Sequence, residues 1–201
     1  MNREEAIKKY LKENEKDIRL SGVKELPADM PDALVFTNSD CNEIAELLKS
    51  KKEAGAPVKR VIAQACVEHP RLRGWLKDNG YLIYGEELWK EEDTFCETTA
   101  AVLESMADEK ENEEAQTGLR AEIYYYGTEE TYNELPLLLR INNNQVLPEF
   151  LFLKIEEATQ IAKEIEHSSS SLSEEMLEKK HKAMLRVQQL GIVGNSMYPI
   201  D

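Results

Sequence analysis

The feature that most constrains the fold is an alternation of short apolar runs with helix-like segments between residues 33 and 103. Four runs predict strands: ALVF (33–36), VKRVIAQA (58–65), YLIYGEEL (81–88) and TFCETTAAVL (94–103). Segments with helical apolar spacing follow the first two runs, and they end at Gly55 and Gly80. This alternation predicts an α/β fold with a mostly parallel sheet, closed by an antiparallel hairpin because only 89–93 separates the last two strands.

The segments before and after this core differ from it in residue composition. Residues 3–16 have helical composition, and residues 17–20 (DIRL) predict a short strand. The segment 106–118 is acidic and lacks large apolar residues after Met106, which favours a solvated linker. We therefore expect a first domain over 1–105, an acidic linker over 106–118 and a carboxyl-terminal segment over 119–201.

Two helices joined by a serine loop are predicted in the carboxyl-terminal segment. The first, 149–167, has a coiled-coil seam of Leu151, Ile155, Ala158, Ala162 and Ile165. The second begins after Ser173 and ends at Gly191, with a facing stripe of Leu177, Met184, Val187 and Leu190. The short connection predicts an antiparallel helical hairpin over about 149–190.

Composition excludes several classes of protein. The start of the chain is charged and no apolar run reaches the length of a membrane helix, so we expect a cytoplasmic protein without a membrane partner. Three widely spaced cysteines without a CxxC pair argue against a disulfide scaffold and against a bound metal. A net charge of −14 disfavours nucleic-acid binding except through local basic clusters, such as 71–73 and 179–182.

A set of motifs then appears in a fixed order along the chain. They are Gln64, Leu72-Arg73-Gly74-Trp75-Leu76, Asn79-Gly80-Tyr81, Glu86-Glu87, Glu92-Asp93 and Glu97, followed by the segment YNELPLLLRINNNQVLPEFLFLKIEE. In this order they resemble the bacterial tRNA (adenine-N1)-methyltransferases of the TrmK type. The resemblance covers most of residues 33 to 190. It implies a Rossmann-like methyltransferase sheet with a coiled-coil appendage, S-adenosylmethionine as cofactor and tRNA as partner.

The chain departs from that family at the positions that would hold the cofactor. The family's glycine-rich loop has no counterpart, because no Gly-x-Gly occurs in the sequence. On the resemblance, the family's first two strands are absent, so the chain is a partial sheet for which no cofactor is expected in the chain alone. Asn38, Asp40 and Gln64 stand where polar active-site groups would lie, and for Asn38 and Asp40 we favour a helix-capping role.

The same comparison predicts an exposed sheet edge. In the family's sheet the strand that corresponds to ALVF lies beside the first strand, so here ALVF would become an apolar edge. Such an edge must be covered by the helix at 3–16, by a second copy or by a separate polypeptide that supplies the missing half of the sheet.

Three functions remain open. The first is a degenerate or split TrmK-like protein that acts as an RNA-binding or partner subunit, with phosphate contacts from Arg71, Arg73, Lys179, Lys180, Lys182 and Arg186. The second is an active tRNA methyltransferase with an atypical cofactor site. The third is an acidic protein–protein interaction module built on a Rossmann remnant.

Overall fold

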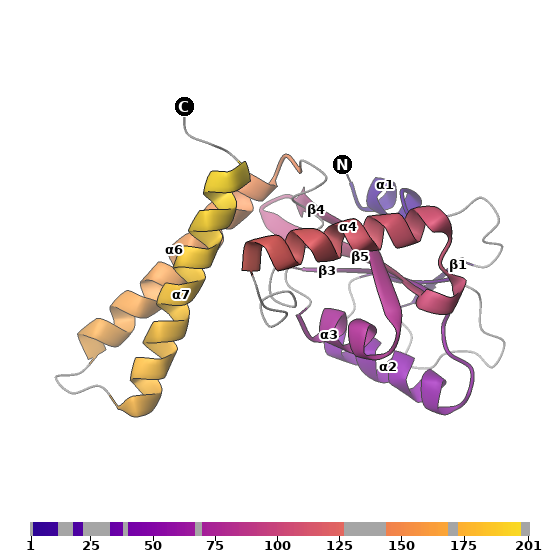
Figure 1. Cartoon of the computed structure of the whole chain (residues 1–201), viewed down its shortest axis with the longest axis horizontal. Coiled ribbons are helices and arrows are strands. Elements are labelled where there is room, and N and C mark those ends of the chain that lie inside the picture. Colours follow the sequence, from indigo (N-terminus) through magenta and orange to yellow (C-terminus); the bar gives the residue numbers. More distant parts are fainter. Residues whose placement is uncertain are drawn as a thin grey trace. The chain divides into compact units, whose positions relative to one another are not determined.

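The computed structural model describes seven stretches of the chain: residues 2–11, 18–21, 33–37, 40–66, 70–126, 144–168 and 173–197. At some positions within these stretches only the backbone is described. The chain divides into two compact units, Met1–Asn144 and Gln145–Asp201. The first contains the sheet and the second contains a pair of long helices (Figure 1).

The first unit is built on a five-stranded sheet with the order β1-β2-β3-β5-β4. Its strands are β1 (Ile18–Ser21), β2 (Ala33–Thr37), β3 (Arg60–Cys66), β4 (Tyr81–Glu91) and β5 (Thr94–Leu103). β1, β2 and β3 are parallel, whereas β5 is antiparallel to both β3 and β4. The mixed α/β architecture and the antiparallel hairpin predicted by the sequence are confirmed.

The expected open edge at ALVF is wrong. β1 pairs in parallel with β2, from Ile18 opposite Ala33 to Ser21 opposite Phe36. The physical reason is local: the short DIRL segment supplies the backbone partners that an apolar strand needs. Pairing of this strand therefore requires neither a second copy nor a separate polypeptide.

Helices α2 (Cys41–Glu53) and α3 (Pro70–Asp78) pack on one face of the sheet (Figure 1). Each ends as predicted, before a glycine with positive φ: Gly55 at 76° and Gly80 at 79°. The face that they cover is apolar, and the largest fully buried side chains of its core are Leu34, Phe36, Ile44, Leu48, Leu72 and Leu76. This packing accounts for the apolar spacing on which the two helix predictions depend.

Helix α1 (Arg3–Lys8) lies on the opposite face, together with α4 (Glu109–Tyr126) (Figure 1). α1 is shorter than the predicted helix over 3–16, and residues 12–16 lie outside the described part of the chain. Tyr10 follows α1 and packs over the glycine of β4, since a Cβ built on Gly85 would lie 2.0 Å from Tyr10 Cε1. A glycine is therefore required at this position for the amino-terminal segment (residues 2–11) to reach the sheet.

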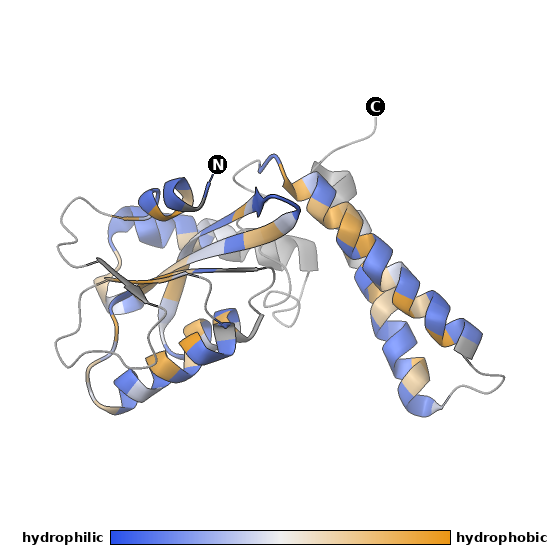
Figure 2. Cartoon of the chain, turned by 180° about the vertical axis from the view of Figure 1, so that it is seen from behind, coloured by the Kyte–Doolittle hydropathy of each residue, from blue (hydrophilic) through white to orange (hydrophobic). Residues whose placement is uncertain are grey.

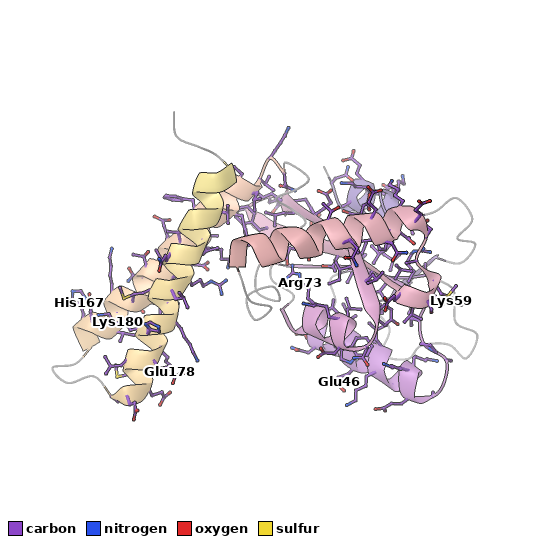
Figure 3. All side chains as sticks on the ribbon, viewed as in Figure 1. Glu46, Lys59, Arg73, His167, Glu178 and Lys180 are labelled. Atoms are coloured by element: carbon purple, nitrogen blue, oxygen red, sulfur yellow. The ribbon has the colours of Figure 1, made fainter. Side chains whose placement is uncertain are left out.

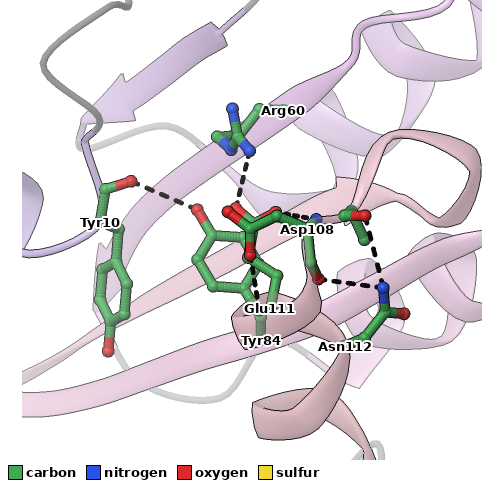
Figure 4. Close-up of polar contacts among 7 residues, drawn as sticks. Tyr10, Arg60, Tyr84, Asp108, Glu111 and Asn112 are labelled. Atoms are coloured by element: carbon green, nitrogen blue, oxygen red, sulfur yellow. Dashed lines mark hydrogen bonds and ion pairs between the residues drawn. The ribbon is translucent and has the colours of Figure 1, made fainter.

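The segment 106–118 differs from the solvated linker that its acidity predicts. After a short 3-10 turn (Glu104–Met106), α4 begins with a reciprocal cap. The Glu111 backbone N–H donates to Asp108 Oδ1, and the Asp108 N–H donates to Glu111 Oε2, both at 2.9 Å. Arg60 on β3 adds a 2.7 Å ion pair to Glu111, which anchors this acidic helix on the sheet (Figure 4).

The second unit consists of α6 (Leu147–Ser168) and α7 (Glu174–Met197), which lie side by side (Figure 1). Of the seam predicted for α6, Leu151 and Ala158 are buried, whereas Ile155, Ala162 and Ile165 are half-buried, so the coiled-coil packing stays a prediction. The stripe predicted for α7 is wrong at its first two positions, because Leu177 and Met184 are 52% and 56% exposed. Leu190 is buried as predicted, and Ala183 is buried with it. Hydropathy is mapped along both helices in Figure 2.

The predicted end of the second helix is also wrong. α7 continues through Gly191 to Met197. Gly191 has no positive φ and keeps helical backbone. A glycine inside a helix costs only about 1 kcal/mol relative to alanine, so it ends a helix only where it adopts the left-handed conformation.

Candidate functional site at the carboxyl ends of the parallel strands

A row of polar residues crosses four strands at the end of the sheet where β2 and β3 finish. The strand registers place Thr37 beside Gln64, Gln64 beside Thr98, and Thr98 beside Glu87. Residues paired across neighbouring strands point to the same face of a sheet. In open α/β sheets ligands bind near the carboxyl ends of parallel strands, so this row is the candidate functional site.

Thr98 is the centre of the row. Its Oγ1 accepts hydrogen bonds from Gln64 Nε2 and from Trp89 Nε1, both at 3.0 Å. A hydroxyl oxygen has two lone pairs, and these two donors occupy both. The three side chains are at most 3% exposed, so this part of the site is a fixed interior network.

Glu87 forms the outer end of the row. Its Oε1 accepts a 3.4 Å hydrogen bond from the Tyr10 hydroxyl and also pairs with Lys9. Its Oε2 accepts a 3.3 Å hydrogen bond from Asn144 Nδ2. Burial is the main cause that raises the pKa of Tyr10, so this hydroxyl keeps its proton and remains a donor.

A buried ionic triad lies on the other face at the same end of the sheet. Arg73 Nε lies 2.5 Å from Glu86 Oε1, and Arg73 Nη2 lies 2.7 Å from Glu97 Oε1. All three side chains are at most 2% exposed, and Figure 3 marks Arg73 beneath the sheet. The triad joins α3 to β4 and β5. Its residues are among those that carry the family resemblance.

The structure shows where two of the predicted site residues lie. Asp40 caps α2 as expected, because its Oδ1 accepts from the backbone N–H groups of Asn42 at 2.7 Å and Glu43 at 3.4 Å. Gln64 lies in the polar row described above. Asn38 lies outside the described residues.

The predicted phosphate contact from Arg73 is wrong. Its guanidinium is 0% exposed and is held by two carboxylates, so it cannot reach an RNA backbone. The side chain of Arg71 is not among those that the structure describes.

The basic residues of α7 lie in ion pairs. Lys179 pairs with Glu175 and Lys182 with Glu178, each at 2.8 Å and one turn apart. Lys180 pairs with Glu166 across to α6, and its hydrogen bond is the main cause that lowers the pKa of Glu166 (Figure 3). Arg186 is half-buried. These cations thus lie on one helix, α7, whereas Arg73 belongs to α3 in the first unit.

Sequence reasoning missed Glu87, Thr98 and Asn144 as site residues. A signal existed for the glutamate: Glu86 and Glu87 are adjacent in a strand, so they must point to opposite faces. With both faces covered, each carboxylate needs a buried partner. The contact from Asn144 had no local signal, because 56 or more residues separate it from its partners.

The described residues contain no group of three or more His, Cys, Asp or Glu side chains that could hold a metal ion. Among the helices that the structure describes, none is long and apolar enough to cross a membrane.

Comparison with solved structures shows the same fold in several proteins. B. subtilis TrmK, an M1A22 tRNA methyltransferase, matches at 18% identity with a TM-score of 0.63, covering 84% of this chain and 65% of its own. An uncharacterised protein from Listeria monocytogenes serotype 4b matches at 17% identity with a TM-score of 0.60, covering 81% and 63%. M. capricolum TrmK in complex with S-adenosyl-homocysteine matches at 15% identity with a TM-score of 0.55, covering 83% and 64%.

This chain therefore spans less than two thirds of the length of these solved proteins. No curated protein matches it. The family model described as TrmK, tRNA (adenine(22)-N(1))-methyltransferase, matches residues 3–190, which is nearly the whole chain and includes both units. The chain belongs to the TrmK family of tRNA (adenine(22)-N(1))-methyltransferases.

Proposed function

We propose that this chain works in the N1-methylation of tRNA adenine as an RNA-engaging module of the TrmK type. In this proposal the helical pair contacts the tRNA, and the methyl donor is held with the help of a second polypeptide or a second copy. The observation that carries the proposal is the family match over residues 3–190. The cytoplasmic location expected from the sequence stays a prediction.

The arrangement at the carboxyl ends of the strands supports a donor site that is incomplete in this chain. A dinucleotide or nucleoside cofactor needs glycines where the backbone approaches it closely, and the sequence contains no Gly-x-Gly. Polar side chains described at this end already have partners within the fold: Asp40 caps α2, and Gln64 donates to Thr98 in the interior. The methyl group is supplied by S-adenosylmethionine when that cofactor is bound.

The charge of α7 supports the RNA contact. After the three glutamates at its start, α7 carries Lys179, Lys180, Lys182 and Arg186 and no further acidic residue, although the whole chain has a net charge of −14. Exposed ion pairs between residues four apart contribute only about 0.3–0.5 kcal/mol. Phosphate groups can therefore displace the glutamate partners of the exposed lysines at little cost.

The contribution of this chain to the reaction is positioning. N1-methylation needs the adenine nitrogen in line with the methyl carbon, and holding two reactants in that geometry is a major part of catalysis. A helical pair that binds the tRNA body would keep the RNA on the same chain as the sheet. The buried network Gln64–Thr98–Trp89 would keep the end of the sheet rigid.

A charge-neutralising variant tests the RNA contact. Lys179→Gln with Lys182→Gln should weaken binding of an unmodified tRNA transcript and reduce the slope of log affinity against log salt by about 2. Lys110→Gln is the matched control, because Lys110 is also exposed and paired with a glutamate one turn away, but lies on α4. Equal effects from both changes would contradict a contact specific to α7.

A second candidate is an active methyltransferase with its own, atypical cofactor site. The observation that favours it is the S-adenosyl-homocysteine complex of the structurally similar M. capricolum protein. Isothermal titration with S-adenosylmethionine separates the two candidates. Heat that saturates at submillimolar cofactor would support the second candidate and overturn the incomplete donor site.

A further inference from the structure

The Glu87 carboxylate is contacted by two chain segments that are far apart in sequence. From the amino-terminal segment, Lys9 pairs with it and the Tyr10 hydroxyl donates to Oε1. From the end of the first unit, Asn144 Nδ2 donates to Oε2. Glu87 is 4% exposed, and Tyr10 and Asn144 are at most 8% exposed. The two segments thus share one buried anion.

The chemistry of the shared group explains why an acid is needed. An ionised carboxylate has two acceptor oxygens, and here each oxygen serves a different segment. A glutamine has the same shape but only one acceptor oxygen. Its amide NH₂ group cannot accept a hydrogen bond, so it would face the donors of one segment without bonding to them. Glutamine could therefore satisfy either the amino-terminal segment or Asn144, but not both.

Asn144 occupies a special place in the chain. It is the last residue of the first unit, and α6 begins three residues later at Leu147. Its amide also donates to the backbone oxygen of Leu88 at 2.7 Å, so two bonds hold it on β4. The first helical hydrogen bond of α6, from Phe150 N–H to the Val146 oxygen at 3.1 Å, follows immediately. These bonds therefore fix the last residue of the first unit on β4, three residues before α6 begins.

A second contact strengthens the amino-terminal side. Tyr84 on β4 donates from its hydroxyl to the Tyr10 backbone oxygen at 3.3 Å (Figure 4). The two rings meet edge-on with centroids 5.9 Å apart. Packing of Tyr10 against Tyr84 thus positions Lys9 and the Tyr10 hydroxyl, which bind Glu87. The carboxylate then has little freedom to rotate.

We propose that Glu87 is a positioning residue that couples docking of the amino-terminal segment to the root of the helical pair at Asn144. Release of either segment frees the carboxylate to turn, which loosens the other segment. Its use in tRNA binding rests on the function proposed above, because that function assigns RNA contact to the helical pair. The coupling itself is a property of the fold.

Hydrogen–deuterium exchange of the full chain, read by mass spectrometry, tests the coupling in both directions. Lys9→Gln should speed exchange at the amides of residues 150–153, in the first bonded turn of α6. Asn144→Ala should speed exchange at residues 6–10. We expect at least a threefold change at the distant segment in each case. Lys8→Gln and Gln145→Ala are matched controls, since they are exposed neighbours, and should change neither segment.

These outcomes test the coupling through Glu87 independently of the tRNA-binding function proposed above. Distant effects with unchanged exchange over residues 60–66 support the coupling, and effects confined to the mutated segment overturn it. Glu87→Gln should speed exchange at both segments, and if it unfolds the sheet the two single-segment variants still decide. A chain that shows the coupling but binds no tRNA leaves this inference standing and refutes the proposed function.

Discussion

The buried triad of Arg73, Glu86 and Glu97 makes a strong prediction about stability. Replacing Arg73 by methionine leaves two carboxylates that are at most 2% exposed without their cation. Breaking a buried ion pair from one side costs about 3–5 kcal/mol, because an uncompensated charge stays in the interior. Since a domain is stable by only about 5–15 kcal/mol, Arg73→Met should approach the limit of folding.

Urea denaturation followed by circular dichroism measures this cost. With a urea dependence of about 2 kcal/mol/M, a loss of about 4 kcal/mol lowers the unfolding midpoint by about 2 M. The deficit should shrink at acidic pH. Protonation removes the uncompensated negative charges from the interior as the pH falls, which relieves the penalty.

A triple variant distinguishes the ionic explanation from a simple loss of packing. Changing Arg73, Glu86 and Glu97 together to methionine removes all three charges, and the resulting stability should lie within about 1 kcal/mol of the unmodified chain. A loss below about 1 kcal/mol in the single variant would refute this reasoning. So would a triple variant that is as unstable as the single one.

Three further predictions concern single positions. Gly85→Ala should undock the amino-terminal segment, since the new Cβ would lie 2.0 Å from Tyr10 Cε1; faster hydrogen exchange in residues 6–10 measures this, and no change would contradict it. The free energy of unfolding should fall as pH rises from about 10 to 12, because burial raises the pKa of Tyr81 to about 12 and its hydroxyl donates to the Val58 oxygen. Tyr81→Phe should flatten this part of the pH profile. Glu92 has a φ of 54°, so Glu92→Gly should raise the free energy of unfolding by about 1 kcal/mol, and a decrease would show that the glutamate side chain matters there.

Local signals in the sequence predicted much of the fold because their physical causes are local. Gly55 and Gly80 adopt the left-handed conformation that ends a helix, and Asp40 caps α2 through its own side chain. The strand over 94–103 matches β5 because most of its residues are apolar, β-branched or small and suit a strand that is covered on both faces. These features depend on residues within a few positions of one another.

Errors arose where a distant partner decides the outcome. Arg73 flanks the apolar residues of α3, and only β4 and β5, which bring Glu86 and Glu97, make it an interior residue. In α7, two overlapping apolar patterns compete, and the one containing the small Ala183 faces the packed side, leaving Met184 exposed. Sequence periodicity alone does not choose between two such patterns.

The acidic segment shows the same limit. Its Asp108-x-x-Glu111 spacing is a helix-start signal, but the run of acids favoured a linker. Arg60 on β3 supplies the opposite charge, and it lies 51 residues away. For the candidate site, Gln64 was identified from the family resemblance, whereas the partners of Glu87 come from both ends of the first unit.

Titration of a labelled, unmodified tRNA transcript carrying adenine at position 22, at 50 and 200 mM salt, tests the central claim most directly. An RNA-engaging chain with two or three phosphate contacts should bind saturably at 50 mM and about 10- to 40-fold more weakly at 200 mM. Absence of binding at 50 mM, or an affinity that does not change with salt, would contradict the account.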